Sequence, residues 1–229
     1  MIFLAYSFES SIGNPYWRYF WDKLVEGGFP RDVSLKRYPR TMSKTSYYNY
    51  IRASLIKKES AYVEFYSDEQ KDSRVLDRVL IDVDYEKVKY FDLHLLDREW
   101  NLIRVFCRYF WDYIDLYFSG KKGFHITLYT EPFKVDAKTK RVLREWVRAW
   151  LGDPLLLDTS GFLDLRRVIS VPMTYHSKTG LLVIPVRFDM NLDEILLASS
   201  NPTDEYLKQF MGSKKRWDIT NLPCICEFL

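Results

Sequence analysis

The chain has 229 residues, of which 47% are hydrophobic and 28% are charged, enough for one large domain or two small lobes with a proper core. Its three cysteines, Cys107, Cys224 and Cys226, are too sparse for a disulfide framework or an evident four-ligand structural zinc site. No signal peptide is recognisable, and no run approaches the roughly 20 apolar residues that span a bilayer. We therefore expect a cytoplasmic chain without structural zinc and without a membrane partner.

Charge alone does not identify a binding partner, because the net charge is only +3. The basic residues nevertheless cluster, and the aromatic share of 17% is high. Such clusters can line a groove for an anionic polymer or can be solvated faces, and aromatic residues can build a core or a stacking surface. The clusters are Lys36, Arg37 and Arg40; Lys57 and Lys58; Lys121 and Lys122; and Lys214, Lys215 and Arg216.

The first predicted element is a helix that begins at Pro15. Asn14 can cap it, Pro15 suits the first turn, and Gly27 with Gly28 can end it. Residues 30–50 are basic and rich in tyrosine, and they predict irregular structure.

In the remainder of the chain, apolar residues recur either with the alternation of a strand or with the spacing of a helix. The predicted strands cover residues 62–67, 79–85, 113–119, 124–129, 166–171 and 181–186. The predicted helices cover residues 98–112, 137–151 and 191–198. Strands and helices mix irregularly, with several hairpin-like pairs that include 166–171 with 181–186. This pattern favours an α+β fold with a mainly antiparallel sheet.

Two aspartates stand two positions apart in the strand at 79–85, so Asp82 and Asp84 share one face of it. The residues around them are apolar, which indicates a central strand. Buried carboxylates need a partner, and a divalent cation that prefers oxygen ligands is a natural one. The alternative is an exposed acidic strand face.

The sequence SGKKGFH at residues 119–125 joins two predicted strands. Its glycines leave the backbone free to approach an anion, and Ser119, Lys121 and Lys122 could bind a triphosphate. His125 begins the next strand, where it could hold a phosphate oxygen. The alternative is a plain hairpin turn, for which Gly-Lys-Lys-Gly is favourable chemistry.

A third carboxylate, Asp158, follows an apolar run and is expected at the end of a buried strand. Further along, residues 172–180 read PMTYHSKTG, in which His176 and Lys178 could face a nucleotide. The alternatives are a helix cap or turn residue for Asp158 and a loop histidine with a local hydrogen bond for His176.

In this order, the four elements resemble the archaeo-eukaryotic primase superfamily. They are D-x-D at 82–84, SGKKGFH at 119–125, the lone Asp158, and PMTYHSKTG at 172–180 with LLVIPV after it. The resemblance spans about residues 60–190. It implies a primase-like catalytic core of two α/β units, one similar to an RNA-recognition-motif sheet, with the active site between them.

The resemblance also implies roles for individual residues. Asp82, Asp84 and Asp158 match the catalytic aspartates that hold two Mg²⁺ or Mn²⁺ ions. The residues expected to bind the incoming nucleotide are Ser119, Gly120, Lys121, Lys122, His125, His176, Lys178, Arg166 and Arg167. The last two would replace a basic residue that the family usually has two positions before Pro172, where this chain has Ser170.

The chain also departs from parts of the superfamily. It lacks the zinc-binding insertion that cellular primase small subunits often carry between the first two motifs. Its first motif and final loop differ from those of the bacterial end-joining branch, and it looks closer to the primases of archaeal plasmids, viruses and replicons.

We expect a primase-polymerase catalytic domain over residues 1–212 and a C-terminal tail over residues 213–229. Residues 221–229 resemble the opening of the helical domain that follows the catalytic domain in plasmid primases. The tail is therefore either the start of such an accessory domain or an ordinary terminus.

The implied activity is template-dependent nucleotidyl transfer by a DNA primase, a DNA polymerase or both, joining NTPs or dNTPs with release of pyrophosphate. The expected partners are a single-stranded DNA template, a primer strand, and a helicase or accessory helical primase domain. Arg37, Arg40, Tyr47, Tyr48 and Tyr50 are candidates for template contacts. The alternatives are a gap-filling or translesion polymerase without de novo priming, a metal-dependent nuclease, and a non-catalytic nucleic-acid-binding module.

Overall fold

The structure is a computed structural model that describes residues 14–26, 31–35, 38–84, 93–151 and 162–219. Asp158 lies outside the described residues, as do Arg37, Gly27 and Gly28. For Asp84, the described part is the backbone in its strand.

The main sheet has four strands in the spatial order β4–β6–β5–β8, and each neighbouring pair is antiparallel. The strands are β4 (Val75–Asp84), β5 (Ile114–Phe118), β6 (Gly123–Lys134) and β8 (Ile184–Pro185). Every residue of β5 and the first eight of β6 are buried. The centre of the sheet is therefore covered on both faces.

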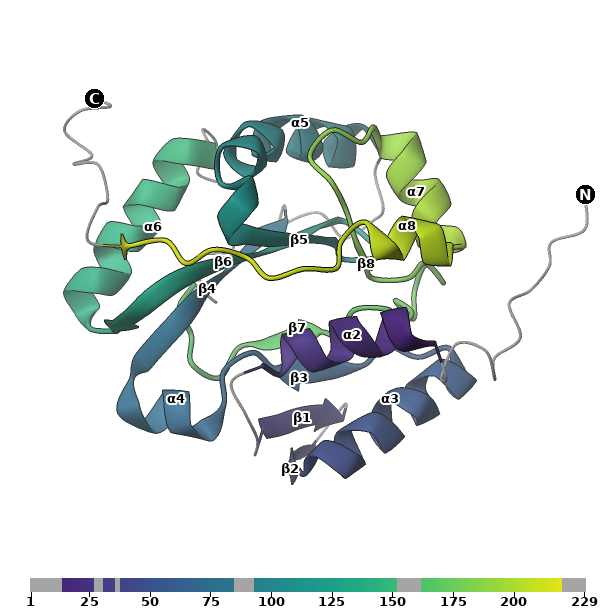
Figure 1. Cartoon of the computed structure of the whole chain (residues 1–229), viewed down its shortest axis with the longest axis horizontal. Helices are drawn as coiled ribbons and strands as arrows, with labels where there is room; N and C mark the ends of the chain where they lie inside the picture. Colours follow the sequence, from purple (N-terminus) through teal and green to yellow (C-terminus); the bar gives the residue numbers. More distant parts are fainter. Residues whose placement is uncertain (1–13, 27–30, 36–37, 85–92, 152–161, 220–229) are drawn as a thin grey trace, which may run out of the picture.

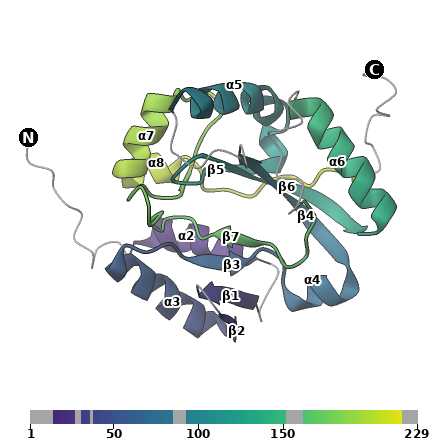
Figure 2. The ribbon, with the colours of Figure 1, turned by 180° about the vertical axis from the view of Figure 1, so that it is seen from behind.

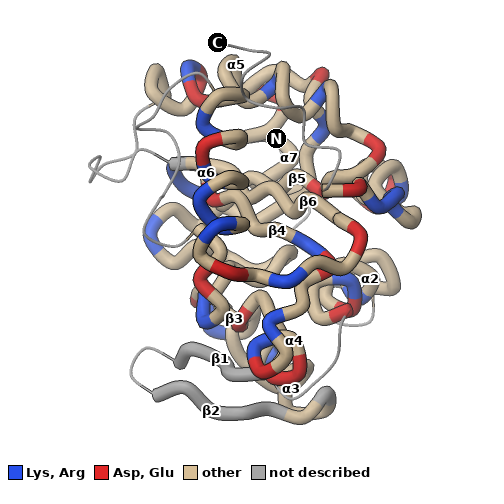
Figure 3. Tube along the Cα trace, turned by 90° about the vertical axis from the view of Figure 1, so that its left-hand side faces the viewer, with Lys and Arg blue, Asp and Glu red and all other residues tan. Residues whose placement is uncertain are grey.

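Two long helices, α5 (Leu93–Tyr109) and α6 (Ala137–Leu151), lie on one side of this sheet (Figure 1). The apolar residues of α6 recur at helical spacing, and Leu143, Trp146 and Val147 are buried. Lys and Arg occupy many of its other positions, as the blue segments along α6 in Figure 3 show. A 3₁₀ turn, η1 (Trp111–Tyr113), leads from α5 into β5.

The opposite side of the main sheet carries a second layer (Figures 1 and 2). In it, β3 (Tyr62–Glu64) pairs with β7 (Val168–Ser170), and the hairpin of β1 (Arg31–Leu35) and β2 (Tyr38–Met42) lies beside β3. The helices α2 (Pro15–Leu24), α3 (Lys44–Lys57) and α4 (Asp68–Ser73) belong to the same half of the molecule.

Two short helices, α7 (Leu192–Ser200) and α8 (Asp204–Lys208), complete the fold beyond β8. The side chain of Asn191 accepts a hydrogen bond from the backbone N–H of Glu194, and the Glu194 carboxylate accepts one from the Asn191 N–H. This capping box fixes where α7 begins.

Several predictions from sequence are confirmed. The fold is α+β, and all pairs of the named strands in the described residues are antiparallel. The helix at 137–151 has the predicted bounds. The helix after Asn14 begins at Pro15, and the Asn14 side chain accepts a hydrogen bond from the Tyr16 N–H at 2.8 Å. The organisation into two α/β units stays a prediction.

Two other predictions are wrong. The described part of residues 30–50 is not irregular, since it forms β1, β2 and the first half of α3. The segments 166–171 and 181–186 do not pair with each other, because β7 pairs with β3 and β8 pairs with β5. Local pairing occurs nearer the turn, at the bridge between Tyr175 and Leu182.

The described part of the predicted tail packs against the main sheet. The Trp217 N–H donates to the Tyr129 carbonyl at 3.0 Å, and the Glu131 N–H donates to the Trp217 carbonyl at 3.0 Å. The Trp217 ring also stacks on Trp146, with 4.9 Å between the centroids. The domain boundary between residues 212 and 213 remains a prediction.

Within the described residues, we find no helix with the length and apolar character needed to cross a bilayer.

Candidate active site

Asp82 on β4 and His125 on β6 are direct cross-strand partners in the main sheet. Paired residues of neighbouring strands place their side chains on the same face, and the His125 Nε2 lies 3.7 Å from the Asp82 Oδ1. Their side chains are only 11% and 18% exposed. The predicted metal ligand and the predicted phosphate ligand are therefore neighbours in a largely buried position.

Arg167 reaches the same carboxylate from the second layer. Its Nη2 donates to the Asp82 Oδ2 in an ion pair. Because Arg167 immediately precedes β7, Asp82 and His125 must face the β3–β7 layer, away from α5 and α6. The candidate site therefore lies between the main sheet and the second layer.

The segment predicted to bind phosphate forms a tight turn between β5 and β6. The Ser119 N–H donates to the Gly123 carbonyl at 2.9 Å, and the Gly123 N–H donates to the Ser119 Oγ at 3.2 Å. Gly120 has a φ of +79°, a conformation that glycine adopts at little cost. The hairpin interpretation is thus confirmed, and it leaves phosphate binding by the same turn as a prediction.

The loop that carries His176 packs directly against this turn. The Thr179 Oγ1 donates to the Gly120 carbonyl, and the Lys178 N–H donates to the His176 Nδ1 at 3.3 Å. A Cβ at Gly120 would lie 3.0 Å from the His176 Cβ and 3.1 Å from the Leu181 carbonyl oxygen. The two loops predicted to hold the nucleotide therefore form one contiguous surface.

The electrostatics of this surface favour an anion. Burial, together with the charges of Lys121, Lys178 and His125, lowers the pKa of His176 to about 4. His176 is therefore a neutral imidazole at pH 7, surrounded by positive charge. A triphosphate is the kind of ligand that such a set of groups attracts.

The base of the His176 loop is held by residues that sequence analysis missed. The Trp21 Nε1 on α2 donates to the Pro172 carbonyl at 2.9 Å. Met173 is fully buried and has a φ of +59°, which is uncommon for a residue with a side chain. Nothing in the sequence around Trp21 indicates this contact, because it joins residues 151 positions apart.

Some predicted residues stand apart from the cluster. The Arg166 side chain is exposed, and within the described ranges no hydrogen bond or ion pair joins it to the other candidates. The expectation that Tyr47 contacts a template is wrong, because its side chain is fully buried. Tyr50 accepts a hydrogen bond from the Tyr62 N–H at 2.9 Å, and Tyr48 donates one to Asp22. These tyrosines pack locally.

Of the three carboxylates predicted to hold a cation, the structure describes the side chain of Asp82. Asp82 offers carboxylate oxygens, and Asp84 occupies the next position on the same strand face, opposite Gly123. Within the described part of the chain, no group of three His, Cys, Asp or Glu side chains could hold a metal ion. The third predicted ligand, Asp158, falls outside that part.

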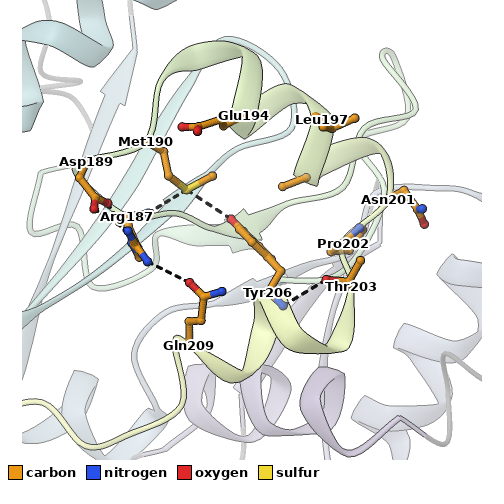
Figure 4. Close-up of a pocket in the computed structure, with 11 residues that line it drawn as sticks. Arg187, Asp189, Met190, Glu194, Leu197, Asn201, Pro202, Thr203, Tyr206 and Gln209 are labelled. Carbon is orange, nitrogen blue, oxygen red and sulfur yellow. Dashed lines mark hydrogen bonds and ion pairs between the residues drawn. The ribbon is translucent and has the colours of Figure 1, made fainter.

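A separate cavity of ≈ 540 Å³ lies between α7 and α8, and no predicted site residue lines it (Figure 4). Across it, Tyr206 donates to the Pro185 carbonyl, and Arg187 pairs with Asp189 while donating to the Gln209 Oε1 at 2.9 Å. These contacts fasten α8 to the end of β8.

No protein-family model and no curated protein matches the chain. Among solved structures, it is similar to the polymerase domain from Mycobacterium tuberculosis Ligase D in complex with DNA, at 15% sequence identity and a TM-score of 0.41. The similarity covers 80% of this chain and 75% of that chain.

Proposed function

We propose that this chain is a template-dependent nucleotidyltransferase, acting as a DNA primase, a DNA polymerase or both. One observation carries the proposal. Three segments that are distant in sequence meet at one place, namely β4 with Asp82, the Ser119–Gly123 turn with His125 after it, and the His176 loop. An acidic strand beside a cationic, glycine-containing turn suits a nucleoside triphosphate that carries a divalent cation.

The reaction would be attack of a 3′-hydroxyl on the α-phosphorus of an NTP or dNTP. The 3′-oxygen–phosphorus bond forms as the bond to the pyrophosphate oxygen breaks, and pyrophosphate leaves. Asp82, Asp84 and Asp158 would hold Mg²⁺ or Mn²⁺, which when bound neutralises triphosphate charge and activates the attacking oxygen.

The chain's own residues would position and neutralise the nucleotide. Lys121, Lys122 and Lys178 would balance the negative charge of the triphosphate, and His125 would donate to a phosphate oxygen. The neutral His176 would donate or accept a hydrogen bond without adding charge. Positioning and electrostatics of this kind carry most of the catalysis in phosphoryl transfer.

A gap-filling or translesion polymerase of the same superfamily would use the same residues but would need a primer. A non-catalytic nucleic-acid-binding module would need none of the carboxylates. One assay distinguishes both alternatives from the proposed function.

The test is synthesis on single-stranded DNA with labelled nucleotides and Mg²⁺ or Mn²⁺, with and without an annealed primer. Short strands made without a primer would support a primase. Extension only when a primer is present would support a polymerase without de novo priming. Binding of DNA without synthesis in any lane would leave the binding module, and degradation of DNA without nucleotides would indicate a nuclease.

A further inference from the structure

Arg167 contacts the carboxylate that the proposed function assigns to a cation. We propose that Arg167 occupies Asp82 in the cation-free protein, and that a divalent cation must displace its guanidinium in order to bind. The inference rests on the proposed function, because it takes Asp82 as a cation ligand. It gives Arg167 a role as a competitor at the cation site, in addition to a contact with the nucleotide.

A cation and the Arg167 guanidinium would compete electrostatically for one carboxylate. The Arg167 Nη2 donates to the Asp82 Oδ2, while the Oδ1 faces the His125 Nε2 at 3.7 Å. The Asp82 side chain is only 18% exposed, so solvent screens charges at this position weakly. A cation bound to the same carboxylate would lie within a few ångströms of the guanidinium, and the two would repel each other.

The backbone of Arg167 is held by hydrogen bonds that do not involve its side chain. The Arg167 N–H donates to the Asp164 carbonyl at 3.0 Å, and the Phe65 N–H donates to the Arg167 carbonyl at 2.9 Å. These bonds anchor the backbone beside the end of β3. The side chain is 25% exposed, so it is accessible from solvent.

A displaced guanidinium has an obvious new partner. A nucleoside triphosphate bound beside Lys121 and Lys178 would bring phosphate oxygens to this side of the sheet, and a guanidinium can contact phosphate through two parallel hydrogen bonds. Arg167 would therefore exchange one anion for another when the cation and nucleotide arrive together. The exchange also keeps Asp82 neutralised before the cation binds.

The experiment measures Mn²⁺ binding to the intact chain by electron paramagnetic resonance of the free ion, without nucleotide and at low salt. Arg167→Gln should bind Mn²⁺ with a dissociation constant about three- to tenfold lower than the wild type, because no guanidinium competes. Arg167→Lys keeps the charge but loses the planar guanidinium, so its dissociation constant should lie between those of the wild type and Arg167→Gln. Asp82→Asn should abolish this binding in either background.

The matched control is Arg148→Gln, which removes the same charge from an ion pair with Glu145 on α6. It should bind Mn²⁺ as the wild type does. Asp82-dependent binding that is equal or weaker in both Arg167 variants would overturn the inference and leave the proposed function in place. A wild type and Arg167 variants that all show no Asp82-dependent binding would remove the cation site, and the inference with it.

Discussion

Gly120 and His176 are in such close contact that a Cβ added to the glycine would lie 3.0 Å from the His176 Cβ. The contact joins the β5–β6 turn to the loop after β7, and Thr179 reinforces it with a hydrogen bond to the Gly120 carbonyl. Neither loop forms the candidate nucleotide surface alone. The packing between them therefore determines whether the site assembles.

Gly120→Ala should damage the site through both strain and collision. The positive φ of Gly120 is unfavourable for alanine, and the new methyl group meets the backbone carbonyl of Leu181 at 3.1 Å. We expect a loss of about 1–3 kcal/mol in the free energy of unfolding, measured by urea denaturation, together with weaker nucleotide binding.

Gly180→Ala is the control for this substitution. Gly180 has a similar φ of +71°, but nothing lies within 4 Å of its added Cβ. It should lose stability through strain alone and keep its nucleotide affinity closer to that of the wild type. Equal effects of the two alanines on nucleotide affinity would contradict a role for the Gly120–His176 contact.

Trp21→Phe should loosen the base of the His176 loop. The change keeps an aromatic ring in the core but removes the donor to the Pro172 carbonyl, leaving a buried acceptor unsatisfied. We expect a cost of about 1–3 kcal/mol in the free energy of unfolding and faster amide hydrogen exchange in the His176 loop. Unchanged exchange in that loop would mean that Trp21 does not hold it.

The free energy of unfolding should decrease as the pH falls through the range between the unfolded and the folded pKa of His176. Its pKa is about 4 in the folded chain, against an ordinary value of 6.5. Below pH 6.5 the unfolded chain binds a proton at His176 that the folded chain does not. The stability that the neutral His176 contributes is therefore fully present above pH 6.5 and declines as the pH falls to 4. His176→Gln should therefore flatten the pH dependence of the free energy of unfolding in this window.

The matched variant for the pH experiment is His94→Gln, since His94 is exposed on α5. It should lose stability with falling pH in the same way as the wild type. Parallel pH curves for wild type and His176→Gln would show that the His176 pKa is not depressed by the fold.

The segment after residue 212 should contribute to the stability of the folded chain. A chain of residues 1–212 loses the stacking of Trp217 on Trp146 and the backbone bonds between Trp217 and β6. We expect it to be less stable than a chain of residues 1–219 by at least about 2 kcal/mol. Thermal unfolding of the two chains checks this, and equal melting temperatures would place the boundary at 212 as predicted from sequence.

The elements that the sequence predicted well are those specified by neighbouring residues. Asn14 and Pro15 define the start of α2 through a local cap, and Leu143, Trp146 and Val147 define the buried stripe of α6. The alternation in residues 79–85 likewise located most of β4. Signals of this kind need no knowledge of the rest of the chain.

Long-range pairing could not be predicted from such patterns. The partner of β7 is β3, where Tyr62 faces Ser170, so no turn between neighbouring segments indicates the pair. The helix α3 was missed because Tyr47, Ile51 and Leu55, which are buried at helical spacing, are interspersed with polar and basic residues.

The candidate site, too, could be predicted in its local patterns but not in its long-range contacts. The positions of Asp82, His125 and His176 could be proposed from short sequence patterns, but their contacts depend on the sheet and on loop packing. The ion pair of Arg167 with Asp82 joins residues 85 positions apart. It could not be predicted locally, and it suggests a competitor for a carboxylate that the pattern alone assigned to a cation.

The central claim is that Asp82 takes part in nucleotidyl transfer, and one measurement tests it most directly. Wild type and Asp82→Asn are incubated with a primed DNA template, a labelled nucleotide and Mn²⁺, and the label joined covalently to the primer strand is quantified. We expect template-dependent incorporation by the wild type and a loss of at least about a hundredfold in the variant, with circular dichroism showing that both are folded. Equal incorporation by both proteins, or none by a folded wild type on any template, would contradict the claim.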